Sequence, residues 1–292
     1  MKIEFTDDNL VIHGIKNFNL TDIFDCGQCF RFDRLDDITY IGTAFGKTVR
    51  VSQENDKIIL HNTTEDDFKT IWVDFFDLNR DYSAIINTLT SSDDVVIREA
   101  ISYGSGIRIL KQDLWETMIS FIISASNNIP RIKKIIDLLC TNFGETHTYE
   151  GNVYYSFPSP DRIAQLGADE LSVIRAGFRE KYILKCAKMV CNGEFDLDGL
   201  RHLSTAEAKK KLMSLPGIGN KVSDCILLFA LNRFDSFPID VWIKRIMEYC
   251  YFNSKEQSID TIARFAADKF GNLGGIAQQY LFYYARGLKI GT

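Results

Sequence analysis

The most constraining feature of this 292-residue chain is a Gly-rich turn between two apolar segments, within the sequence LPGIGNKVSDCILLFALNRFDSFPID from Leu215 to Asp240. The glycines permit a sharp turn, and they let backbone N–H groups come close to an anion. Lys221 follows the turn at the start of the next apolar segment, and Asp240 comes nineteen residues later, just after Pro238. The spacing predicts a helix, a tight hairpin and a second helix, with an amine and a carboxylate beside the turn.

The period of the apolar residues changes along the chain. Runs such as VIHGI, TYIGTAF, TVRVSQ and KIILHN alternate with a period of two and are separated by Asp, Asn and Gly, which is typical of antiparallel strands. From about Ile107 the period becomes helical, over residues 113–126, 129–143, 181–192, 205–215, 220–232, 240–250 and 261–270. We therefore expect an α+β fold, with an N-terminal antiparallel β domain at 1–106 and a helical core at 107–292.

The net charge of −5 is distributed unevenly. Residues 1–100 contain 10 Lys and Arg against 19 Asp and Glu, a balance of −9, so the remaining residues carry 24 against 20, a balance of +4. The basic surplus thus lies in the part of the chain that contains the turn. It favours a local contact with phosphate and argues against a basic surface that binds any nucleic acid.

The seven cysteines fit a reducing compartment, and their odd number leaves at least one of them unpaired. Cys26 and Cys29 form a CxxC pair, but no second pair or nearby His completes a zinc site, so two ordinary small thiols are the favoured interpretation. The chain has no apolar run long enough to span a membrane, and its first residues lack the pattern of a signal peptide. We expect an intracellular protein.

Four separated blocks, in order, carry a resemblance to a known family. The turn resembles the helix-hairpin-helix signature, and with Lys221, Pro238 and Asp240 it resembles the hairpin-Gly/Pro-Asp superfamily of DNA base-excision glycosylases. CGQCFRF at 26–32, the segment 108–132 and GGIAQQYLFYYA at 274–285 are similar to 8-oxoguanine DNA glycosylases of the eukaryotic type and their bacterial relatives. The resemblance implies a twisted N-terminal sheet packed on two helical lobes with DNA between them, and a last helix that packs back near the N-terminal domain.

The resemblance implies the roles of the two candidate catalytic residues. Lys221 would attack C1′ of the damaged nucleotide as a neutral amine, form a Schiff base and permit β-elimination. Asp240 would stabilise the positive charge that develops on the sugar and exchange protons with the lysine. The alternatives are a lysine that only binds phosphate and an aspartate that only caps the helix beginning at 241.

The same resemblance implies a pocket for the extruded base. Cys225 and Phe229 follow Lys221 at helical spacing, and Gln278 and Phe282 are four residues apart on the last helix. Cys225 and Phe282 would sandwich the base while Gln278 reads its Watson–Crick edge. The carbonyl of Gly27 would accept the N7 hydrogen that only the oxidised base carries. Phe30 and Pro238 would complete the pocket. The alternatives are ordinary core side chains and an ordinary strand glycine.

Further residues would contact the opposite base and the DNA backbone. The turn after the helix at 113–126 would fill the gap left by the extruded nucleotide and read the cytosine opposite it. Ser126 stands where the family carries asparagine and Phe178 where it carries tyrosine, so we expect looser selection of the opposite base. Trp242 stands where the family carries histidine, so we expect altered contacts to the 5′ phosphate. The full set in these positions is Ser126, Asn127, Asn128, Arg131, Phe178, Arg179 and Trp242.

In the hairpin, the N–H groups of Gly217, Gly219 and Val222 would bind phosphate. The carbonyls of Met213, Leu215 and Ile218 could hold a monovalent cation, as in related hairpins. No divalent metal or organic cofactor is expected, since an amine nucleophile requires neither. The expected partner is double-stranded DNA containing oxidised guanine, bound by a monomer. The alternatives are a glycosylase for alkylated purines, which Lys221 disfavours, and a hairpin protein that binds DNA without catalysis, which the presence of both Lys221 and Asp240 disfavours.

Overall fold

The computed structural model describes residues 2–6 and 8–289, and it begins with a six-stranded antiparallel sheet. The strand order is β1-β2-β6-β5-β4-β3. The strands are β1 (Lys2–Thr6), β2 (Asn9–His13), β3 (Phe32–Arg34), β4 (Thr39–Ala44), β5 (Lys47–Glu54) and β6 (Lys57–His61). Along β2 the side chains of Leu10 and Ile12 are buried, while their neighbours in the strand are more exposed. This alternation explains why the sequence pattern identified the strands.

One face of the sheet is covered by a short helical segment rich in aromatic residues. It consists of α2 (Glu65–Asp67), a π-helical turn (Phe68–Trp72) and α3 (Val73–Phe75). The rings of Trp72, Phe75 and Phe76 pack on one another. Together with Phe24, from the helix at Leu20–Asp25, and Phe32, from β3, they form much of the buried cluster around the sheet. The sheet therefore has its own apolar core.

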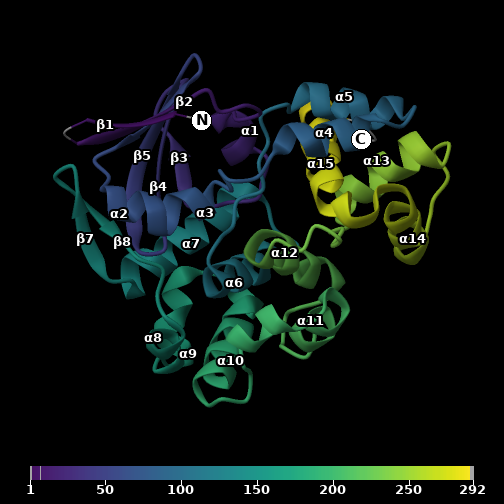
Figure 1. Ribbon diagram of the computed structural model, residues 1–292. Coiled ribbons are helices and arrows are strands. Elements are labelled where there is room, and N and C mark those ends of the chain that lie inside the picture. The colour runs from purple at the N-terminus through teal and green to yellow at the C-terminus, as the bar shows by residue number, and fades with distance from the viewer. Residues whose placement is uncertain (1, 7, 290–292) are drawn as a thin grey trace.

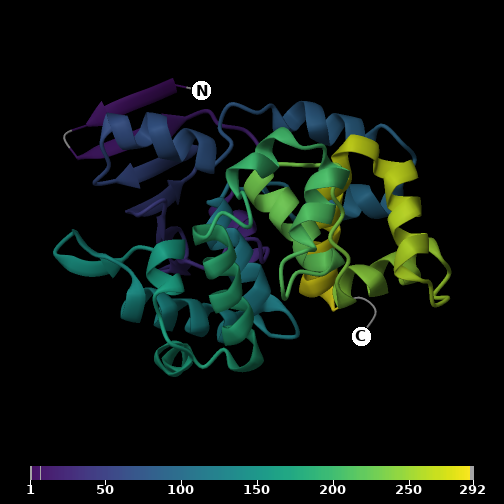
Figure 2. The same cartoon turned by 90° about the horizontal axis from the view of Figure 1, so that it is seen from below.

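The remaining helices form two groups, shown at the bottom and at the right of Figure 1. The first group contains α6 (Leu114–Ser124), α7 (Ile129–Phe143), α8 (Pro160–Ala164), α9 (Ala168–Leu171), α10 (Glu180–Cys191), α11 (Thr205–Leu212) and α12 (Asn220–Leu231). The second contains α4 (Tyr82–Thr90), α5 (Val95–Tyr103), α13 (Val241–Tyr251), α14 (Ile259–Phe270) and α15 (Gly274–Leu288). Figure 2 shows α10–α12 between the α6–α8 segment and α14–α15. A shared buried cluster joins the two groups.

The helices between residues 65 and 103 differ from the strands expected for the first hundred residues. Leu89, Ile97 and Ile101, from α4 and α5, belong to the buried cluster of the helical core and not to that of the sheet. In Figure 1 α5 lies beside the yellow α15, and the two helices are in contact. The clusters thus favour a domain boundary ahead of α4, while the boundary at residue 106 stays a prediction.

Two smaller elements complete the fold. The excursion expected at 146–160 contains a hairpin of β7 (Thr146–Tyr149) and β8 (Asn152–Tyr155). Its Tyr149 hydroxyl accepts from the Arg50 N–H and donates to the His61 carbonyl, which fastens the hairpin to the sheet. Helix α1 (Leu20–Asp25) precedes the turn that contains Gly27. No helix in the described residues is long and apolar enough to cross a membrane.

Candidate active site

The Gly-rich turn lies between α11 and α12, and Lys221 is the second residue of α12, as the sequence predicted. Gly217 has φ of +83°, and a Cβ atom there would lie 2.8 Å from the ring of Tyr182. Both observations require glycine at this position. Helix α12 has nine consecutive buried residues from Val222 to Ala230, so the helix that carries the lysine is fixed within the core.

The Lys221 amine is held by helix α6. Its Nζ donates to the Ser124 hydroxyl oxygen at 3.1 Å, and the Ser124 hydroxyl donates to the Phe121 carbonyl at 2.8 Å. The same Nζ lies 5.0 Å from the centre of the Phe121 ring. Because the Ser124 proton is directed to the carbonyl, the hydroxyl oxygen is free to accept from the amine. Ser124 and Phe121 were absent from the predicted site, because nothing local in the sequence connects them with a lysine 97 positions later.

Asp240 caps α13, and its carboxylate accepts from the Ile243 N–H at 2.8 Å. Burial raises the pKa of the Asp240 carboxyl, against the opposing effects of the Ile243 N–H and of the positive charge on Lys221. Capping is therefore present, and the Trp242 N–H also contributes to it. The carboxylate also lines the cleft together with Lys221.

Next to these two residues is a small recess with the composition expected of a base pocket. Its walls include four predicted pocket residues, Cys225, Phe229, Pro238 and Gln278, and the edge is formed by Gly27 and Phe282. Burial raises the pKa of the Cys225 thiol to about 12, so the thiol is neutral and serves as an apolar wall. The Gln278 amide oxygen is buried and has no hydrogen-bond partner among the described residues. An unpaired buried acceptor favours a ligand that supplies a donor at this point.

Phe282 lines both the recess and the cleft beside it. The recess is small, with a free volume of about 40 Å³. Gly27 has φ of +80°, and a Cβ atom there would lie 3.1 Å from the Phe282 ring and 3.3 Å from an Arg286 guanidinium nitrogen. The alternative of an ordinary strand glycine is wrong, because Gly27 lies in a turn with positive φ between α1 and β3. We infer that side chains lining the recess, such as Phe282, move when a base enters.

Arg286 is a third residue at the site that the sequence did not indicate. Its guanidinium lies 5.3 Å from the centre of the Phe282 ring, and its positive charge lowers the pKa of Asp240. Its Nη1 atom is buried without a hydrogen-bond partner among residues 2–6 and 8–289. Arg286 therefore places an unused donor and a positive charge at the mouth of the recess.

The recess opens into a cleft of about 810 Å³. Ser126, Asn127 and Asn128, from the turn between α6 and α7, line this cleft, as do Phe30 and Trp242. Ser126 has φ of +49°, a backbone conformation that asparagine tolerates better than serine. The Asn128 side chain caps α7 by accepting from the Arg131 N–H at 3.0 Å, and the Arg131 side chain is exposed one turn further on.

Arg179 contacts the back of this turn. It is only 4% exposed, and its guanidinium donates to the carbonyls of Ala125, Ser126 and Ala176. The neighbouring Phe178 is 55% exposed, and the Arg179 guanidinium lies 4.3 Å from the centre of its ring. In this structure Arg179 therefore stabilises the turn between α6 and α7. Its guanidinium would have to release these carbonyls before it could contact a base.

The hairpin has the geometry of an anion site. Gly219 is the N-cap of α12, and the N–H of Val222 lies in the first turn of that helix, where backbone N–H groups lack helical partners. The Leu215 carbonyl accepts from the Ile218 N–H at 3.3 Å, which leaves it one lone pair for a cation. No cluster of three or more His, Cys, Asp or Glu side chains suited to a metal ion is found in residues 2–6 and 8–289. The monovalent cation stays a prediction.

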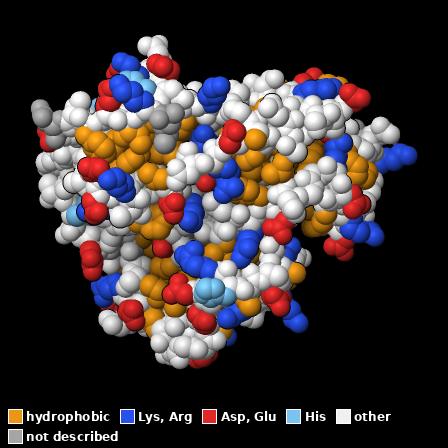
Figure 3. Space-filling view, viewed as in Figure 1, with side chains coloured by type: hydrophobic (Ala, Val, Ile, Leu, Met, Phe, Trp, Pro, Cys, Tyr) orange, Lys and Arg blue, Asp and Glu red, His pale blue; other side chains and the backbone are white. Residues whose placement is uncertain are grey.

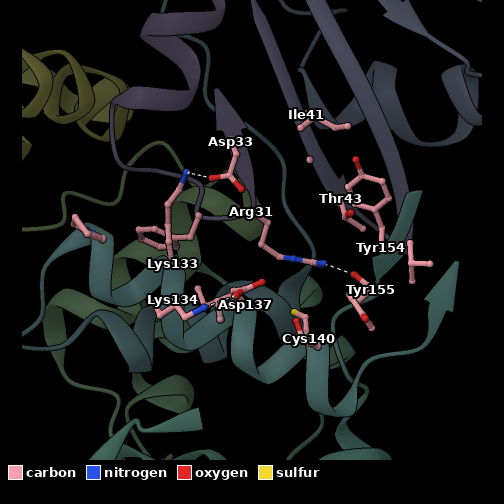
Figure 4. Close-up of a pocket in the computed structure, with 16 residues that line it drawn as sticks. Arg31, Asp33, Ile41, Thr43, Lys133, Lys134, Asp137, Cys140, Tyr154 and Tyr155 are labelled. Atoms are coloured by element: carbon pink, nitrogen blue, oxygen red, sulfur yellow. Dashed lines mark hydrogen bonds and ion pairs between the residues drawn. The ribbon is translucent and has the colours of Figure 1, made fainter. Parts of the chain in front are cut away.

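A second hollow of about 530 Å³ lies between the edge of the sheet and α7 (Figure 4). Its cations are already paired: Lys133 with Asp33 at 2.8 Å, Lys134 with Asp137 at 3.1 Å, and Arg31 with Glu116 and the Tyr155 carbonyl. Lys133 connects α7 to β3, and Arg31 connects the residues before β3 to α6 and to the β7–β8 hairpin, whereas Lys134 and Asp137 both lie in α7. We therefore assign this hollow a structural role. On the face shown in Figure 3, basic and acidic side chains are interspersed, which agrees with the absence of a uniformly basic coat expected from the sequence.

Comparison with known proteins agrees with this geometry. Residues 11–118 match the family described as "8-oxoguanine DNA glycosylase, N-terminal domain", and residues 119–270 match the "HhH-GPD superfamily base excision DNA repair protein" family. The chain belongs to the 8-oxoguanine DNA glycosylase family of the HhH-GPD superfamily. The family resemblance expected from the four sequence blocks is thereby confirmed, as is the α+β fold.

Solved structures of this glycosylase family superpose over nearly the whole chain. The structure described as "MBOgg1 in complex with low affinity DNA ligand" is 45% identical, with a TM-score of 0.95 and 99% coverage of both chains. The Clostridium acetobutylicum 8-oxoguanine glycosylase/lyase, in complex with double-stranded DNA containing cytosine opposite 8-oxoguanine, is 40% identical, with a TM-score of 0.96 and 99% coverage of both chains. The N-glycosylase/DNA lyase of Saccharomyces cerevisiae is 35% identical over 158 residues, which are 50% of this chain and 42% of the yeast protein.

Proposed function

We propose that this protein releases 8-oxoguanine from double-stranded DNA and then cleaves the strand at the resulting abasic site. One observation carries the proposal: the Lys221 amine and the Asp240 carboxylate meet a recess that is walled by Cys225, Gln278 and Phe282 and opens into a long cleft. The solved relatives support the proposal, because one of them is a glycosylase/lyase and both were solved in complex with DNA.

The damaged nucleotide would leave the duplex and enter the recess. Phe282 would move aside and then lie against one face of the base, while the neutral Cys225 thiol lies against the other. The buried Gln278 amide would pair with the Watson–Crick edge, and this contact would satisfy its unpaired oxygen. The Gly27 carbonyl would accept the N7 hydrogen of 8-oxoguanine. Guanine carries a lone pair at N7 and would face this carbonyl oxygen without a hydrogen bond.

Lys221 would then act as the nucleophile. Its uncharged amine attacks C1′, the C1′–N9 bond breaks, and the bonding electron pair leaves with the base, which takes up a proton. The amine loses one proton, and the C1′–O4′ bond then breaks as O4′ takes up a proton, which leaves a protonated Schiff base between Nζ and C1′. Loss of a proton from C2′ then forms a double bond between C2′ and C3′, and the C3′–O bond breaks with its electron pair leaving on the 3′ phosphate. The Ser124 hydroxyl would hold the amine in position before the attack.

Asp240 would stabilise the positive charge on the sugar as the C1′–N9 bond breaks. A carboxylate in a partly buried site interacts more strongly with that charge than one in water, because solvent screening is weaker. Its fixed orientation, set by the Ile243 N–H, means that little reorganisation accompanies the reaction. The chemistry requires only an amine and a carboxylate, so we propose no divalent metal and no organic cofactor.

The turn at Ser126, Asn127 and Asn128 would occupy the gap left by the extruded nucleotide, with Arg131 and Arg179 near the opposite base. The Gly217, Gly219 and Val222 backbone would bind a phosphate of the damaged strand, and a monovalent cation at the Met213, Leu215 and Ile218 carbonyls would neutralise part of the phosphate charge. The serine is shorter than an asparagine and fills less of the gap. We therefore propose modest selection of the opposite base, by a monomer that acts on DNA inside the cell.

The proposal is tested by incubating the enzyme with duplexes that contain one 8-oxoguanine, one 7-methylguanine or one guanine opposite cytosine. Free base and strand breaks are quantified separately, the breaks without alkali. We expect base release and strand cleavage on the 8-oxoguanine duplex only. Release of 7-methylguanine alone would replace the proposal with an alkylated-purine glycosylase. Binding of all duplexes without release of any base would favour a non-catalytic hairpin protein.

A further inference from the structure

Three glutamine side chains surround the turn that contains Gly27. The Gln279 amide, on α15, donates to the Cys26 carbonyl at 2.7 Å, and the Gln112 amide donates to the Gln28 carbonyl at 2.7 Å. Gln279 is 2% exposed, so little water reaches its amide to compete for this hydrogen bond. The carbonyl before Gly27 is therefore fixed by a buried amide donor, and the carbonyl after it by a half-buried one.

The third glutamine, Gln28, uses its whole side-chain amide inside the core. Its oxygen accepts from the Leu110 N–H at 2.9 Å, and its nitrogen donates to the carbonyls of Ile23 at 2.9 Å and Arg108 at 2.8 Å. Gln28 is fully buried. These bonds attach the residue after Gly27 to helix α1 on one side and to the 107–112 segment on the other.

The Gly27 carbonyl itself accepts no hydrogen bond from the described residues, 2–6 and 8–289. Its orientation depends on the plane of the peptide between Gly27 and Gln28. The planes on either side are held by Gln279 and Gln112, so the middle plane has little freedom to rotate, although glycine alone would permit it. Gly27 also lines both the recess and the cleft.

We propose that Gln279, Gln112 and Gln28 form a frame that holds the Gly27 carbonyl as a preorganised acceptor and so determines the discrimination between 8-oxoguanine and guanine. The inference rests on the proposed function, in which this carbonyl accepts the N7 hydrogen. The three glutamines are positioning residues, because their amides bond to backbone groups around Gly27. Gln279 also lines the recess, whereas Gln112 and Gln28 do not. Helix α15 thus carries the base-edge reader Gln278 and the frame residue Gln279 side by side.

The preference for 8-oxoguanine depends on how well this single acceptor is aligned. A hydrogen bond with good geometry contributes roughly tenfold to binding, and a guanine lone pair facing the same oxygen adds a penalty. A Gly27 carbonyl that is free to rotate loses its hydrogen bond to 8-oxoguanine. It also avoids the repulsion from the N7 lone pair of guanine. We therefore expect the affinity ratio between the two bases to fall by about tenfold or more when the frame is opened.

The test is Gln279→Met, which keeps the length and approximate volume of the side chain but removes the donor. It is made in the Lys221→Gln background, so that duplexes bind without reacting. Dissociation constants are measured for duplexes with 8-oxoguanine and with guanine opposite cytosine. The matched control is Gln53→Met, because the Gln53 amide also fixes a carbonyl and an N–H, those of Phe18 and Leu20, but in the sheet domain. We expect a reduced ratio for Gln279→Met and an unchanged ratio for Gln53→Met.

Abasic-site cleavage supplies the second measurement, in the background with Lys221 intact. It needs the amine but no base, so Gln279→Met should leave its rate within about twofold while 8-oxoguanine excision falls. If the protein without the Gln279 substitution prefers the 8-oxoguanine duplex and Gln279→Met prefers it to the same extent, the role of the glutamine frame is refuted and the proposed function stands. If the protein without the substitution binds both duplexes equally, the proposed function fails and the frame fails with it. If Gln279→Met does not fold, Gln112→Met is tested in its place. It removes the donor to the Gln28 carbonyl, and the same affinity ratio and cleavage rate are measured.

Discussion

Replacing Asp240 by asparagine separates its two functions, because asparagine caps a helix about as well as aspartate but carries no charge. The Asp240 carboxylate caps α13 through the Ile243 N–H at 2.8 Å. An amide oxygen can accept the same bond. If Asp240 only caps the helix, Asp240→Asn should behave like the wild type. If the carboxylate stabilises charge on the sugar, the variant should fold normally and fail to excise the base.

The expected effect on stability is small and has a definite sign. Burial raises the pKa of the Asp240 carboxyl in the folded state above its value in the unfolded chain. Between these two pKa values the folded state binds the proton more tightly, so the free energy of unfolding falls as the pH rises through that window. The free-energy cost of burying the charged Asp240 carboxylate persists at neutral pH, and the uncharged asparagine does not incur it. Asp240→Asn should therefore be as stable as the wild type or slightly more stable at pH 7, and this gain should vanish at a pH below both pKa values.

Asp240→Ala provides the contrast in stability. It removes the cap, which costs about 1 kcal/mol, and for a chain of this size a loss of that order lowers the melting temperature by about 2–4 °C. The effect on excision is expected to be much larger than either change in stability. Loss of a preorganised electrostatic contact to a transition state costs about 100-fold to 1,000-fold in rate. Both variants should show this loss.

The assay is single-turnover excision of 8-oxoguanine, together with thermal unfolding of the same preparations. Asp81 provides the control, since it caps α4 by accepting from the Ser83 and Ala84 N–H groups and lies outside the cleft. Asp81→Asn and Asp81→Ala should reproduce the stability changes that come from capping and leave the excision rate unchanged. An Asp240→Asn enzyme that excises within threefold of the wild-type rate would refute the electrostatic role.

Three further predictions follow from the same geometry. Ser124→Ala should lower excision and abasic-site cleavage together by about tenfold, because both need the Lys221 amine that the hydroxyl holds; equal rates in the two proteins would remove this role. Phe282→Ala should lower excision by about fivefold to a hundredfold, the range for loss of a base stack, while abasic-site cleavage changes little; equal losses in both reactions would count against stacking. Excision opposite C, A, G and T should differ little, because Ser126 and Phe178 replace larger or more polar residues; a preference for C of a hundredfold or more would show that the two arginines suffice.

The sequence predicted those parts of the site that are local in the chain. The turn, Lys221 and Asp240 lie within 26 residues, and each has a recognisable environment of glycine, proline and apolar neighbours. Cys225 and Phe229 followed from the helical period after Lys221, and both line the recess. Strands β2 and β6 were equally local, because in each of them one buried face imposes a period of two.

The residues that the sequence did not indicate act across long separations. Ser124 reaches Lys221, and Gln279 reaches Cys26, which is 253 positions away, so no local pattern marks either contact. Helices α4 and α5 were missed for a different reason: they are only nine residues long, and their β-branched residues, such as those in VVI at 95–97, are common in strands. Packing against α15, at the far end of the chain, accounts for their helical state better than propensity does.

The central claim is that Lys221 forms a covalent bond to the sugar of the damaged nucleotide. Borohydride trapping on a duplex with one 8-oxoguanine opposite cytosine tests it most directly, with an undamaged duplex and the Lys221→Gln protein alongside. We expect a covalent adduct for the wild type on the damaged duplex alone. We expect no adduct for Lys221→Gln, although that protein should still bind the duplex. Release of 8-oxoguanine by the wild type without any adduct, or an undiminished adduct with Lys221→Gln, would show that Lys221 is not the nucleophile.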